Sequence, residues 1–154
     1  MINLIFPGRA DNTYGGHKLA LWLFALLLLM KGGIGVNSML NGNLVATTAD
    51  GIPVDTYSPA GAQAFVSLFA LWGLSHFMIC LIGVIALVRY RSLVPLMYAV
   101  LLVEHLGRKL LLYFHPIART DMSHGLAINI VLVALLIIGL ALSLWQAKPG
   151  TQTS

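Results

Sequence analysis

The chain has 154 residues, of which 58% are hydrophobic and only 9% are charged, and its mean hydropathy is +0.87. A soluble domain has about 25% charged residues, so this composition excludes a water-soluble globular protein and predicts an integral membrane protein. The formal net charge of +4 is spread along the chain without a basic run, which argues against a nucleic-acid partner.

The first apolar stretch, residues 19–30, predicts a membrane helix over about residues 15–39. Lys31 and two glycines follow it where a cleaved signal peptide would have a small-residue cleavage pattern, so a membrane helix is favoured. The glycine pair favours a break or kink, which would leave residues 34–45 as an interfacial segment. The alternative is a helix that runs on to Leu40 while Lys31 snorkels outward.

Residues 41–57 are rich in Asn, Thr, Asp and Gly, so we expect a polar loop there. Helix two is predicted over about residues 59–88, because Ser58 can cap its start and Pro59 suits the first helical position. A tight turn at residues 89–92 then makes helices two and three antiparallel neighbours.

Helices three and four are predicted over about residues 93–115 and 124–146. Each apolar stretch is close to the ~20 residues that span a bilayer, and none alternates with a period of two. Backbone groups in lipid must be paired internally, which leaves helices or a closed barrel. The sequence therefore predicts an all-α fold in which residues 1–154 form a single transmembrane domain, an integral membrane four-helix bundle.

The basic residues near the predicted helix ends indicate the orientation of the bundle. With four spans they fall on one side of the membrane: Arg9, Lys18, Arg89, Arg91 and Lys148. Basic residues favour the cytoplasmic side, so we expect both termini in the cytoplasm. The expected location is the inner (plasma) membrane of a bacterium.

The third apolar stretch contains the charged string Glu104-His105-Leu106-Gly107-Arg108-Lys109. Ionisable side chains inside a membrane helix are rare and usually face the bundle interior or a cavity. Glu104 and Arg108 are four residues apart, so they share a helix face and can pair. Polar residues of the other helices fall in the same outer half of the bundle: His76, Lys31 and Asn129.

Two interpretations of this polar cluster remain open. In the first, Glu104 and Arg108 form an ion pair that only fixes helix packing, as polar groups between membrane helices do. In the second, the cluster lines a small cavity open to the outer side, which binds a lipid headgroup, a quinone or a small solute. Arg108 would then anchor an anion or carbonyl group, and Glu104 or His105 would handle a proton.

The sequence lacks the patterns of a metal or catalytic site. None of the five histidines lies in a His-x-x-x-His pair, and no Glu-x-x-His pair of a di-iron bundle is present. Cys80 is the only cysteine, which excludes an intrachain disulfide and a Cys-based metal cluster. We therefore expect no metal, no haem or other cofactor and no catalytic residues, and the chain is more typical of a non-enzyme.

The fourth helix carries Gly139 and Ser143 four residues apart, a small-x-x-x-small surface suited to close helix contact. We expect this surface to lie against another membrane subunit or a second copy of the chain. The favoured function is then a non-catalytic accessory or assembly subunit of a larger membrane complex or homo-oligomer. The alternative is a protein that binds or transports a small molecule, lipid or quinone, or a quinone-linked redox component.

The segment Leu106-Gly107-Arg108, together with Trp72-Gly73 on the second helix, resembles the DoxX-like group of small bacterial membrane proteins. The resemblance covers the four helices loosely and implies the same four-span layout. Some members of that group are associated with quinol oxidases. The resemblance carries no catalytic residue over to this chain.

Overall fold

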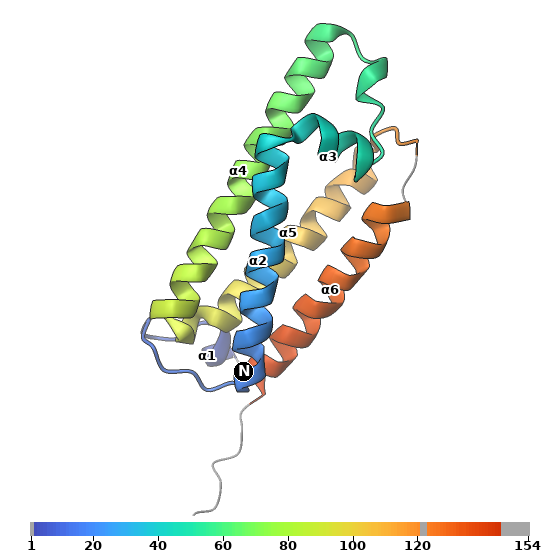
Figure 1. Ribbon diagram of the computed structural model, residues 1–154. Coiled ribbons are helices and arrows are strands. Elements are labelled where there is room, and N and C mark those ends of the chain that lie inside the picture. The colour runs from blue at the N-terminus through green and yellow to red at the C-terminus, as the bar shows by residue number, and fades with distance from the viewer. Residues whose placement is uncertain (1, 121–122, 146–154) are drawn as a thin grey trace, which may run out of the picture.

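The computed structural model describes residues 2–120 and 123–145, and these contain helices and no strand (Figure 1). The helices are α1 (Ile2–Ile5), α2 (Lys18–Leu40), α3 (Gly42–Thr48), α4 (Pro59–Arg89), α5 (Val94–Phe114) and α6 (Ser123–Leu144), with 3₁₀ turns η1 (Val54–Thr56) and η2 (Arg91–Leu93). The all-α prediction is confirmed. Lys148 and the predicted end of helix four at residue 146 lie outside the described residues.

Three helices within the described residues are long and apolar enough to cross a membrane: Lys18–Leu40, Pro59–Arg89 and Leu126–Leu144. The chain is therefore a helical membrane protein with three candidate spans. Helix α5 has 21 residues, which is a spanning length, but its charged string makes it less apolar than the other three.

The long helices alternate in direction along the chain, and α2 packs against α4, α5 and α6 (Figure 1). Helix α4 begins as its sequence predicts. The Ser58 side chain accepts a hydrogen bond from the Gly61 N–H at 3.2 Å, and Pro59 occupies the first turn.

Helix α2 runs without a break through Gly32 and Gly33 to Leu40, so the favoured break in this region is wrong. Glycine inside a helix costs about 1 kcal/mol relative to alanine, and the long contact of α2 with α4 offsets this cost. Lys31 does not snorkel outward, because its side chain is buried among the helices.

Two glycines set the closest approach of α2 and α4. A Cβ added to Gly73 would lie 2.7 Å from the Gly35 carbonyl oxygen, and one added to Gly35 would lie 3.0 Å from the Gly73 carbonyl oxygen. Backbones come this close only where side chains are absent, as in other membrane helix pairs. The glycines that matter for packing are therefore not the adjacent pair that stands out in the sequence.

The loop predicted over residues 41–57 contains ordered helix. Asn41 separates α2 from α3, whose residues pack on α4, and η1 follows before the start of α4. Ala46, Ile52 and Val54 are buried here against α4. Gly51 has a φ of 65°, which suits glycine at the turn after α3. Because the segment is rich in polar residues, its sequence did not indicate that these apolar side chains are buried.

The small residues of α6 contact the chain's own helices. Gly139 faces the ring of Tyr98 on α5, so closely that an added Cβ would overlap it. The Tyr98 hydroxyl donates to the Ala20 carbonyl oxygen of α2 at 2.8 Å. Ser143 is buried, and its backbone carbonyl lies close against Gly16. The expectation that Gly139 and Ser143 face another subunit is therefore wrong, because they serve helix packing inside the chain.

The segment before α2 is bound to the turn between α4 and α5. The Ser92 N–H donates to the Asp11 carbonyl oxygen at 3.2 Å, and the Asp11 N–H donates to the Ser92 hydroxyl at 3.0 Å. Thr13 donates from its hydroxyl and its N–H to the Asp11 carboxylate, which lowers the pKa of Asp11 below its usual value. These bonds hold the segment at the end of the molecule opposite α3 (Figure 1).

Candidate functional site

A buried charge cluster joins α2, α4 and α5. The Lys31 ammonium on α2 lies 3.1 Å from Glu104 Oε2 on α5, and His76 Nδ1 on α4 lies 3.4 Å from Glu104 Oε1. Lys31 and His76 are 1% and 4% exposed, and the Glu104 side chain is 19% exposed. A buried ammonium is tolerable only beside an opposite charge, so Glu104 allows Lys31 to remain inside the helices.

The structure pairs Glu104 with Lys31 and His76, so the predicted Glu104–Arg108 ion pair is wrong. The guanidinium carbon of Arg108 lies 4.7 Å from the ring centroid of Trp72 on α4, a cation–π contact. Spacing along one helix predicted the pair, but Lys31 reaches Glu104 from the neighbouring helix. The carboxylate is therefore used between helices rather than along α5.

A cavity of about 560 Å³ lies beside this cluster. Its lining comes from α2, α3, α4, α5 and α6 and from the loops that join them. Its lining residues lie in the half of the molecule that contains α3, away from the start of α2 (Figure 1). The lining includes aliphatic side chains from each of these helices: Ile34, Leu44, Leu68, Leu112, Ile128 and Leu132. Ligand cavities typically have ~300–1,000 Å³ and mostly apolar walls.

One wall of the cavity is a column of rings along α4. The ring centroids of Phe65 and Phe69 are 5.9 Å apart, those of Phe69 and Trp72 are 5.1 Å apart, and those of Trp72 and His76 are 5.7 Å apart. Spacings of three and four residues place these rings on one helix face. The column was missed in the sequence, although its spacing is visible there.

Four of the six candidate ligand residues line the cavity: Lys31, His76, Arg108 and Asn129. Glu104 does not line it but bonds two residues that do. The helices therefore bring together five of the residues that the sequence singled out.

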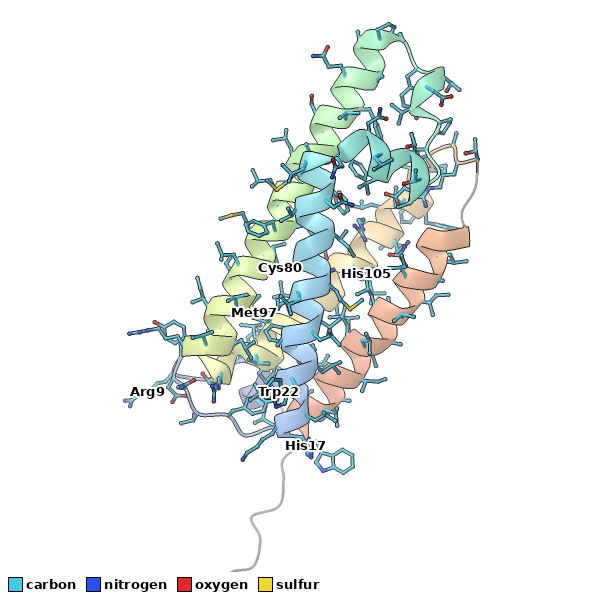
Figure 2. All side chains as sticks on the ribbon, in the orientation of Figure 1. Arg9, His17, Trp22, Cys80, Met97 and His105 are labelled. Carbon is cyan, nitrogen blue, oxygen red and sulfur yellow. The ribbon has the colours of Figure 1, made fainter. Side chains whose placement is uncertain are left out.

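The sixth candidate, His105, is not among the residues that line the cavity. It is completely buried on α5, and within the described part of the chain neither ring nitrogen has a hydrogen-bond partner. Figure 2 shows it on α5 between α2 and α6.

Ser38 is a polar residue of the cavity that sequence reasoning did not single out. Its side chain is 0% exposed, and its hydroxyl has no hydrogen-bond partner within the described residues. A buried hydroxyl without a partner is costly, and such groups usually bond water or a ligand. A single serine in an apolar helix gave no sign of this role.

The described residues contain no group of three or more His, Cys, Asp or Glu side chains placed to hold a metal ion. No protein-family model, curated protein or solved structure matches this chain.

Proposed function

We propose that the chain is an integral membrane protein that crosses the bilayer four times and binds a small amphiphilic molecule in the cavity described above. The apolar body of this molecule lies along the ring column of α4, and its polar head lies near Arg108 on α5. Both termini are on the cytoplasmic side, so the cavity lies in the outer half of the membrane. The proposal rests on the lining of the cavity, which combines apolar and aromatic side chains with cationic ones.

The surface of α5 supports its role as a fourth span. Its charged residues turn inward, since Glu104 bonds neighbouring helices and Arg108 and Lys109 line the cavity. The residues that α5 exposes along its length are apolar: Val100, Val103, Leu106, Leu110 and Leu111. A helix with this division of faces can border lipid on one side and the cavity on the other.

The accessory-subunit function stays a prediction with less support. Gly139 and Ser143, its predicted contact surface, are used inside the chain. The exposed residues of α6, such as Ile130 and Ile137, are as well suited to lipid as to another protein. The DoxX-like resemblance likewise stays a prediction.

Cysteine labelling tests the orientation. In a Cys80→Ala background, we expect a cysteine at Asp55 to react with a membrane-impermeant maleimide added to intact cells. We expect one at Asn12 to react only after the membrane is opened. Both positions are exposed, so access depends on the side of the membrane. The opposite pattern of labelling would reverse the topology.

Fluorescence of Trp72 tests the binding function, because this ring lines the cavity and contacts Arg108. In the Trp22→Phe, Trp145→Phe variant, Trp72 is the remaining tryptophan. We expect a brominated fatty amphiphile to quench it saturably, and an unbrominated analogue to restore the signal by competition. The measurement is made in nanodiscs of unbrominated lipid.

The matched control is the Trp72→Phe, Trp145→Phe variant, in which Trp22 is the remaining tryptophan. Trp22 is 77% exposed on α2 and lies outside the cavity lining. Quenching of Trp22 should rise with the amount of amphiphile in the bilayer and show no saturation or competition. If Trp72 behaves in the same way as Trp22, the cavity does not bind the amphiphile and the proposed function is wrong.

A further inference from the structure

We propose that the cavity selects amphiphiles whose head is a negatively charged oxyanion, a carboxylate or a phosphate, and that Arg108 holds this head. This inference rests on the proposed function and names the chemical class of its ligand.

The charges around the cavity favour an anion. Four cationic side chains of the described residues line it, and one carboxylate does. The cations are Lys31, Arg108, Lys109 and Arg119, and the carboxylate is Asp50. Lys31 is neutralised by Glu104, and Arg119 already takes part in another interaction. Arg108 and its neighbour Lys109 therefore outnumber the carboxylate of Asp50 among the charges that a ligand head meets.

The placement of Arg108 leaves its donors available. Its guanidinium carbon lies over the Trp72 ring, and this cation–π contact is not a hydrogen bond. No hydrogen bond or ion pair joins Arg108 to another described residue. A half-buried guanidinium in this state matches a carboxylate or phosphate, which can accept two parallel N–H bonds.

Ser38 is a second hydrogen-bond donor among the residues that line the cavity. It lies on α2, whereas Arg108 lies on α5, and both line the same space. The buried Ser38 hydroxyl has no partner among the described residues. An oxyanion that reaches this hydroxyl can accept a hydrogen bond from it, whereas an ammonium head accepts none.

The apolar walls exclude a free inorganic anion as the preferred ligand. Aromatic and aliphatic side chains make up most of the lining, and such walls gain free energy only by burying an apolar body. The class assigned by the cavity is therefore an acidic amphiphile, with fatty acids and phosphate monoesters of fatty alcohols as its simplest members.

A series of heads on one brominated chain tests this inference in the Trp72 quenching assay. The heads are a carboxylate, a phosphate monoester, a neutral alcohol and a trimethylammonium group. We expect the two anions to bind at least about tenfold more tightly than the alcohol, as charge-assisted hydrogen bonds do, and the ammonium to bind least. A short soluble acid such as propionate, which lacks the apolar body, should not compete at the same concentration.

Substitutions show which residue gives the cavity its preference for an anionic head. Arg108→Met should bring the affinity for the acid to within about threefold of that for the alcohol, while Arg108→Lys should keep part of the preference. Arg89→Gln, an exposed residue at the far end of α4, should leave the series unchanged. If Arg108→Met does not fold, the head series in the otherwise unchanged protein still decides the question.

The outcomes separate the two proposals. Saturable binding of the alcohol or a neutral quinone as tight as that of the acid would overturn the anion preference and leave the proposed function standing. Propionate that competes as well as the long-chain acid would overturn the assignment of an amphiphile. An anion preference that survives Arg108→Met would remove Arg108 from its role. Absence of saturable binding for every head would refute the proposed function itself.

Discussion

Replacement of Glu104 with Gln should destabilise the protein by about 3–5 kcal/mol, because it leaves a buried ammonium without its counter-charge. Lys31 is 1% exposed and its ammonium lies 3.1 Å from the Glu104 carboxylate. For a chain of this size we expect the melting temperature in mild detergent to fall by roughly 6–20 °C. A melt followed by circular dichroism measures the change.

The double variant Lys31→Met, Glu104→Gln should be more stable than Glu104→Gln alone, because it removes both charges together. Asp55→Asn is the matched control, since Asp55 is an exposed carboxylate whose loss should change stability by no more than about 0.5 kcal/mol. If the Glu104→Gln variant has the same melting temperature as the unaltered protein, the ion pair does not hold α2 and α5 together.

The second large effect is expected at the crossing of α2 and α4. Gly73→Leu should destabilise the protein by about 3 kcal/mol or more, since an added Cβ would already lie 2.7 Å from the Gly35 carbonyl oxygen and 3.0 Å from Met39 N. Backbone atoms cannot turn aside as a flexible side chain does, so the two helices must separate. Chemical unfolding in mixed micelles measures the loss.

Two glycines on neighbouring helices provide matched controls. Gly33 and Gly107 have no atom within 4 Å of an added Cβ, so leucine at either position should not destabilise the protein and should stabilise it by up to about 1 kcal/mol, since a helical glycine is removed. Because Trp72 and Ser38 lie beside this crossing, Gly73→Leu should also weaken saturable quenching. Equal stability of the Gly73 and Gly33 variants would show that the helices do not cross at this point.

Features that depend on one helix at a time could be predicted from the sequence. Hydrophobic runs reveal the apolar helices, and Ser58 with Pro59 marks the start of α4 because a cap acts on the next turn. The depth of Lys31 and His76 along their helices also places them near Glu104, since each residue adds about 1.5 Å.

Features that depend on contacts between helices could not be predicted in the same way. Spacing along α5 pairs Glu104 with Arg108, but the choice of partner depended on the buried Lys31 of α2. Gly139 looked like an outer contact surface because a single sequence does not show Tyr98 facing it. The burial of Ala46, Ile52 and Val54 could not be predicted either, because it depends on their contact with α4.

The most direct test of the cavity as a binding site is a crystal structure grown in a lipidic phase with a brominated fatty acid. Bromine scatters anomalously, so its position is read without interpretation of weak lipid density. We predict an anomalous peak inside the cavity, between the ring column of α4 and α5, with the carboxylate at Arg108. Bromine peaks confined to the lipid-facing sides of α4 and α6, with none in the cavity, would contradict the proposed function.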